Sequence, residues 1–184
     1  MALGSTIYAF DIELADVDRN AYETLALRVA QHPSETPDYL VARVLAYCLE
    51  HADGIGFSKG LSDPGEPAIF VRDLTGALMA WIDIGLPEPE RLHRASKAAP
   101  RVAVYTHKDP AQWAVKLADA RIHRAEKLEV FAFDRAWLAR IVARLERRMK
   151  FSLARSEGDI YLTIGSDTSQ TILGRPLSAI SQIV

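Results

Sequence analysis

The sequence contains little cysteine, little net charge and no long apolar run. Cys48 is the only cysteine, so an internal disulfide is excluded, and its place on the apolar side of an expected helix predicts a buried, inert thiol. No uninterrupted apolar run is longer than Ala77 to Ile82, far below the roughly 20 residues of a membrane helix. The formal net charge of −2 argues neither for nor against a polyanionic partner.

The N-terminal residues also lack the pattern of a secretory signal. Met1 to Ser5 lead straight into a strand pattern, with no basic patch before an apolar stretch. Hydrophobic residues make up 49% and charged residues 25%, which is the composition of an ordinary globular protein. We therefore expect one cytoplasmic domain over residues 1–184, without membrane association.

Residue patterns predict a mixed chain of helices and strands. Alternating apolar residues predict a strand from Tyr8 to Leu14, and helical spacing predicts helices at 16–32, 37–53, 87–99, 110–122 and 134–149. Further strands are expected at 55–61, 66–72, 77–84, 102–105, 128–133, 151–155, 160–164 and near Thr171. This order predicts an α+β fold, with a central mixed sheet flanked by helices and additional N- and C-terminal strands.

Two of these strands bring acidic residues together. If residues 73–76 form the turn, Arg72 pairs with Ala77, and Glu66 then lies opposite Asp83 with Cβ atoms ~5 Å apart. Two such charges destabilise the strands unless a divalent metal, a basic side chain or a shared proton compensates them. A site with only carboxylate oxygens suits Mg²⁺ or Mn²⁺ better than zinc.

Open space and basic residues are expected beside this acidic pair. Gly85 lies two residues beyond Asp83 on the same face and has no side chain. The next helix carries three basic residues, Arg91, Arg94 and Lys97. Lys97 is spaced so that it can fold back toward the space beside Asp83. Two interpretations of the acidic pair therefore remain open: it binds a metal, or it forms ordinary ion pairs with Arg72, Arg91 or Lys97.

Several separated motifs carry a family resemblance: His32-Pro33-Ser34-Glu35-Thr36, Gly60-Leu61, Glu66-Pro67 and Trp81-Ile82-Asp83-Ile84-Gly85-Leu86-Pro87. In length and in the order of these motifs, the whole chain resembles the YaeQ family of small bacterial proteins. That family is regarded as a variant of the PD-(D/E)XK nuclease-like fold, in which a helix, three strands, a helix and a strand surround a metal site. The resemblance therefore implies a restriction-endonuclease-like core.

The resemblance also implies roles for individual residues. Glu66 would be the first strand acid, Asp83 the second, and Glu35 an accessory acid. Lys97 would replace the lysine that normally follows the second acid by two residues, because Gly85 occupies that position here. These roles imply Mg²⁺ or Mn²⁺ held by Glu66 and Asp83, and hydrolysis of a phosphodiester in a nucleic acid.

Each feature also has a structural interpretation. Lys97 can be an exposed helix lysine, and Glu35 a negative charge that favours a helix N-terminus. The basic run from Arg135 to Lys150 can track phosphates or form the solvated face of a helix. A second hypothesis is therefore a catalytically silent module that binds nucleic acid or protein, and a third assigns the acidic face to a dimer interface. The sequence does not determine the oligomeric state.

Overall fold

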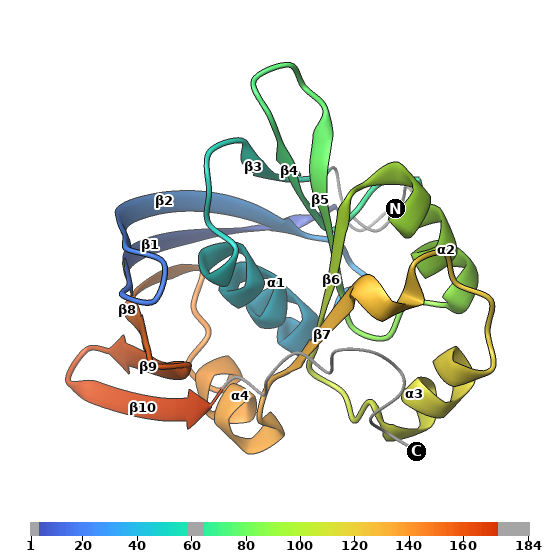
Figure 1. Ribbon diagram of the computed structural model, residues 1–184. Coiled ribbons are helices and arrows are strands. Elements are labelled where there is room, and N and C mark those ends of the chain that lie inside the picture. The colour runs from blue at the N-terminus through green and yellow to red at the C-terminus, as the bar shows by residue number, and fades with distance from the viewer. Residues whose placement is uncertain (1–3, 59–64, 173–184) are drawn as a thin grey trace.

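Two five-stranded mixed sheets organise the chain (Figure 1). The computed structural model describes residues 4–58 and 65–172. The first sheet contains, in order, β10 (Asp167–Ile172), β9 (Asp159–Ile164), β8 (Arg148–Ser156), β1 (Thr6–Asp16) and β2 (Ala21–Gln31). The second contains β3 (Ile55–Phe57), β4 (Ile69–Arg72), β5 (Leu78–Ile84), β6 (Arg101–Thr106) and β7 (Leu128–Ala132).

The helices connect and cover these sheets. They are α1 (Pro37–Leu49), α2 (Pro89–Ala98), α3 (Ala111–Ala118), the short 3₁₀ helix η1 (Ala125–Lys127) and α4 (Arg135–Val142). The predicted α+β class is confirmed, although the N- and C-terminal strands form a sheet of their own. The elements α1, β3, β4, β5, α2 and β6 follow one another in the order helix, three strands, helix and strand, as the residue patterns predict. In the described part of the chain, no helix is long and apolar enough to cross a membrane.

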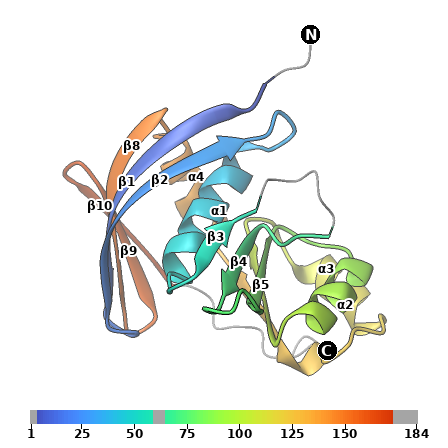
Figure 2. The same ribbon diagram turned by 90° about the horizontal axis from the view of Figure 1, so that it is seen from above.

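Helix α1 lies between the two sheets and forms the centre of the core (Figure 2). Its N-cap is Thr36, whose side chain accepts a hydrogen bond from the Tyr39 N–H at 3.2 Å. Pro37 follows in the first turn, where its missing N–H leaves no hydrogen bond unmade. Cys48 is fully buried, as predicted, and burial raises the pKa of its thiol to about 12.

The predicted helix over 16–32 is wrong, because most of these residues form β2, which runs antiparallel to the whole of β1. The turn between the two strands contains Asn20 at φ 53, a left-handed conformation that asparagine tolerates. The spacing of Tyr22, Leu25 and Val29 fits a helix, yet only Val29 of this strand is buried. Pairing with an eleven-residue neighbour therefore outweighs the local spacing.

The predicted helix over 134–149 is correct only in its first half. Asp134 caps α4, since its side chain accepts a hydrogen bond from the Trp137 N–H at 2.6 Å. The chain then turns, and β8 begins at Arg148 and pairs in parallel with β1. Met149 and Phe151 alternate with exposed residues along β8 and are buried in the core. The basic run is consequently divided among a helix, a turn and a strand.

The β4–β5 hairpin has a register that differs from the predicted one by two residues. Ile69 pairs with Ile82, and the ladder shifts at a bulge between Val71 and Arg72. The loop is also longer, because the Asp73 carboxylate accepts hydrogen bonds from the backbone N–H groups of Thr75 (2.8 Å) and Ala77 (2.9 Å). From Ile69 to Val71 the two-residue shift keeps each side chain on its predicted face, whereas beyond the bulge Arg72 pairs with Leu78 and not with Ala77.

Continued from Ile69 and Ile82, this register places Ala68 beside Asp83. The Ala68 N–H donates a hydrogen bond to Asp83 Oδ1 at 3.3 Å. The expected placement of Glu66 directly opposite Asp83 is therefore wrong. Of the predicted strand over 55–61, β3 forms its first three residues, while Gly60 and Leu61 lie outside the described residues.

Candidate functional site

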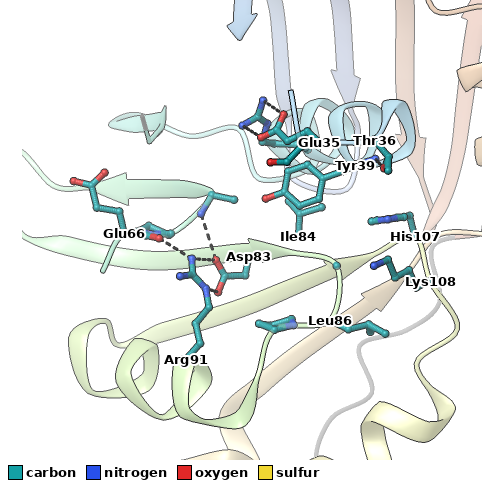
Figure 3. A pocket seen from close by; sticks show the side chains of 16 residues that line it. Glu35, Thr36, Tyr39, Glu66, Asp83, Ile84, Leu86, Arg91, His107 and Lys108 are labelled. Atoms are coloured by element: carbon teal, nitrogen blue, oxygen red, sulfur yellow. Dashed lines mark hydrogen bonds and ion pairs between the residues drawn. The ribbon is translucent and has the colours of Figure 1, made fainter. Parts of the chain in front are cut away.

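A cleft of about 410 Å³ opens where the ends of β4 and β5 meet the start of α1 (Figure 3). Its walls come from the segment that leads into α1, the ends of the β4–β5 hairpin, the first turn of α2 and the residues that follow β6. Since β5 and β6 are parallel neighbours, their carboxyl ends meet at the same edge of the second sheet. The fold therefore brings four separate parts of the sequence to one cavity.

Glu35 lines this cleft as part of a buried ion pair. Glu35 is 6% exposed, its side chain is fully buried, and Arg43 on α1 lies 3.1 Å from each of the carboxylate oxygens. Arg43 also donates a hydrogen bond to the Ala30 carbonyl at 2.7 Å, which ties the end of β2 to α1. Burial raises the pKa of Glu35, although the Arg43 charge opposes that shift. Glu35 is therefore more than a charge at a helix N-terminus.

Asp83 is compensated by arginine, one of the alternatives that the sequence leaves open. Asp83 is 2% exposed, and Arg91 donates to both of its oxygens, from Nε to Oδ2 at 2.7 Å and from a terminal nitrogen to Oδ1 at 2.8 Å. The same terminal nitrogen donates to the Glu66 carbonyl at 2.6 Å. The guanidinium also lies over the Trp81 ring, 5.4 Å from its centroid. Bidentate pairs of this kind are among the strongest and most directional in proteins.

The remaining predicted site residues divide between the cleft and the outer surface. Glu66 lines the cleft, but its carboxylate points away from Asp83 (Figure 3), and only its backbone carbonyl contacts Arg91. Lys97 is exposed in the last turn of α2 and does not line the cleft. The structure thus brings Glu35, Glu66 and Asp83 to one cavity and leaves Lys97 outside it.

Three cleft residues were not anticipated from the sequence: Tyr39, His107 and Lys108. Burial raises the pKa of Tyr39 to about 12, and charges of both ion pairs act on this hydroxyl. His107 meets the Tyr39 ring edge-on, and its buried Nδ1 has no hydrogen-bond partner among the described residues. Lys108 is exposed at the mouth of the cleft. The sequence did contain a signal for His107 and Lys108. Both follow the expected strand over 102–105, and residues after that strand lie at the same sheet edge as the end of β5.

As arranged, Glu66 and Asp83 do not fit a divalent cation. Both Asp83 oxygens already accept hydrogen bonds from Arg91, and the Glu66 carboxylate is turned away. Within residues 4–58 and 65–172, no group of three or more His, Cys, Asp or Glu side chains is placed to hold a metal ion. The geometry therefore supports ion pairing at Asp83 over metal coordination.

We expect His107 to make the folded state less stable in acid. Burial and the neighbouring Lys108 charge lower the His107 pKa below its ordinary value of 6.5. As the pH falls through 6.5, the unfolded chain takes up a proton that the folded chain does not, so the free energy of unfolding decreases. Denaturant unfolding of the parent and of His107→Gln at pH about 7.5 and about 5.5 measures this decrease. Equal pH dependence in the two proteins would contradict the prediction.

Comparison with known proteins shows similarity over nearly the whole chain. A family model described as YaeQ protein matches residues 1–173. The uncharacterized YaeQ protein of Escherichia coli (strain K12) is 33% identical over 165 residues, and that of Salmonella typhi 31% over 164 residues. Each match covers 89% of this chain and 91% of the relative.

Two crystal structures share the fold over nearly the whole chain. The YaeQ protein from Pseudomonas syringae superimposes with a TM-score of 0.86 at 28% identity, covering 95% of this chain and 97% of the other. The YaeQ protein from Xanthomonas axonopodis pv. citri gives 0.85 at 29% identity, covering 95% and 99%. The arrangement that forms the cleft is therefore shared at the level of the backbone fold.

Proposed function

Since this chain belongs to the YaeQ family, we propose from the charges around its cleft that it binds the phosphodiester backbone of a nucleic acid. The observation that carries the proposal is the neutralisation of the two buried carboxylates. Asp83 is paired with Arg91 and Glu35 with Arg43, so neither leaves a full negative charge facing the cavity. A cleft whose two buried carboxylates are paired with arginines repels an anion less than one in which they are unpaired.

Exposed cations lie at the mouth of the cavity and along α2 beyond it. Lys108 lies at its mouth, and α2 carries Arg94 and Lys97 at successive three-residue steps beyond Arg91. Arg94 lies about one turn beyond Arg91 and Lys97 about one turn beyond Arg94, so these cations continue along α2 away from the cleft. Lysine and arginine side chains along such a path neutralise successive phosphates and release counterions. We expect such binding to depend on the charge of the nucleic-acid backbone and to weaken steeply as the salt concentration rises.

The experiment is a titration of fluorescently labelled single-stranded and duplex oligonucleotides, DNA and RNA, followed by anisotropy at several salt concentrations. We expect binding that weakens as salt rises, and the double variant Arg94→Ala/Lys108→Ala should bind more weakly and lower the salt slope by about 1 for each lost phosphate contact. Lys150→Ala is the matched control, because Lys150 is an exposed lysine on the first sheet. No binding, or an equal affinity for the double variant and the control, would contradict the proposal.

A second candidate is metal-dependent hydrolysis of the bound phosphodiester with Mg²⁺ or Mn²⁺. One observation favours it: Glu35, Glu66 and Asp83 come from three separate segments and line one cavity, in the order of elements that the resemblance implies. This activity requires Arg91 to release Asp83. Oligonucleotide cleavage by the parent, reduced roughly 10²–10³-fold in a folded Asp83→Asn variant, would support this candidate over binding alone.

A further inference from the structure

The Arg91 guanidinium lies between the segments that carry Glu66 and Asp83, the two acids that were expected to hold a metal. One of its terminal nitrogens donates to Asp83 Oδ1 at 2.8 Å and to the Glu66 carbonyl at 2.6 Å. A single cationic nitrogen therefore bridges the end of β5 and the segment before β4. The contact uses the Glu66 backbone oxygen, which explains why the Glu66 side chain is able to turn away (Figure 3).

The surroundings hold the guanidinium in this place. Nε donates to Asp83 Oδ2 at 2.7 Å, so both carboxylate oxygens are occupied, and Oδ1 also accepts from the Ala68 N–H. The Trp81 ring lies beneath the guanidinium, and Arg91 belongs to the first turn of α2. A divalent cation that approached Asp83 would have to displace two charge-assisted hydrogen bonds while being repelled by the same guanidinium.

We infer that Arg91 is the resident cation of this cleft and keeps divalent metals away from Asp83. If its side chain is removed, the Asp83 carboxylate and the Glu66 carbonyl remain as hard oxygen ligands around the vacated space. Carboxylate and carbonyl oxygens are the ligands that Mg²⁺ and Mn²⁺ prefer. Arg91→Ala therefore converts an ion pair into a divalent cation site. The inference concerns only Asp83 and its partner, and it stands whether or not nucleic acid is the ligand of the cleft.

The test is a Mn²⁺ titration followed by electron paramagnetic resonance of the free ion. We expect no Mn²⁺ bound by the parent at millimolar concentration, one Mn²⁺ bound by Arg91→Ala, and loss of that ion in Arg91→Ala/Asp83→Asn. The double variant also subtracts weak binding to surface carboxylates. Mn²⁺ bound by the parent and lost in Asp83→Asn would overturn the inference, as would a folded Arg91→Ala variant that binds none.

A second measurement covers the case in which Arg91→Ala folds poorly. Thermal unfolding with and without Mn²⁺, followed by circular dichroism, should show a higher Tm for Arg91→Ala in Mn²⁺ and an unchanged Tm for the parent, because a ligand that binds only the folded state stabilises it. A variant that stays unfolded and is not rescued by Mn²⁺ counts against the inference. Oligonucleotide binding is measured separately, so its failure leaves this result unaffected.

Discussion

Arg43→Ala is expected to lower the free energy of unfolding by about 3–5 kcal/mol, because it leaves the Glu35 carboxylate buried without its partner. Arg43 is 2% exposed and contacts both Glu35 oxygens. Its guanidinium also lies over the rings of Tyr39 and Phe57, 5.8 and 5.7 Å from their centroids, so packing is lost together with the charge. Denaturant unfolding followed by tryptophan fluorescence measures the change.

A matched arginine and a pH series separate this effect from a general loss of stability. Arg28→Ala removes an exposed arginine from β2 and should change the unfolding free energy by no more than about 0.5 kcal/mol. In Arg43→Ala, the largest effect that opposes the burial-induced rise of the Glu35 pKa is removed. Lowering the pH then protonates Glu35 and reduces the loss of stability. If the unfolding free energy of Arg43→Ala fell only as much as that of Arg28→Ala, or if its decrease grew in acid, the interpretation of Glu35 and Arg43 as a buried ion pair would be refuted.

Gly54→Ala is the second substitution with a large expected effect. Gly54 has φ +80, and a Cβ atom there would lie 1.8 Å from the Arg72 carbonyl oxygen, which belongs to β4. The Gly54 carbonyl also accepts a hydrogen bond from the Arg72 N–H at 3.0 Å. In Gly54→Ala, left-handed backbone strain of about 1–2 kcal/mol adds to a backbone clash that would separate β3 from β4. We therefore expect the free energy of unfolding to fall by about 3 kcal/mol or more.

Gly76→Ala provides the control for this second substitution. Gly76 has φ +84, nearly the same backbone conformation, but no atom lies within 4 Å of the added Cβ. Its cost should stay near the strain alone, about 1–2 kcal/mol. Chemical denaturation gives the free energy of unfolding of both variants, and the difference between them isolates the clash with Arg72. Equal decreases in the two variants would contradict the prediction that the close approach of Gly54 to β4 matters for stability.

The sequence predicted the elements around the cleft well, because their patterns are strong. Helix α1 combines a polar cap, a proline in its first turn and a continuous apolar stripe, and α2 begins and ends beside prolines. Strand β2 was missed since three apolar residues at helical spacing also fit a strand that is mostly exposed. Local patterns do not include the energy of pairing with a distant strand, and here that pairing decides the structure.

The details of the site were harder to predict for a related reason. A strand pattern repeats every two residues, so it fixes which face Asp83 occupies but not whether its neighbour is Ala68 or Glu66. The bulge at Val71 and the loop held by Asp73 decide that point. The sequence likewise leaves a divalent metal, a shared proton and a basic side chain from Arg72, Arg91 or Lys97 as alternatives for Asp83. Only the packing of the first turn of α2 against Trp81 selects Arg91.

Crystals soaked in Mn²⁺ and measured at a wavelength where manganese scatters anomalously would show directly what neutralises Asp83. Our interpretation predicts no anomalous peak beside Asp83, and an Arg91 guanidinium that still contacts both of its oxygens. An anomalous peak at a coordination distance of about 2.1 Å from the Asp83 carboxylate, with Arg91 displaced, would contradict it and favour metal-dependent chemistry in this cleft.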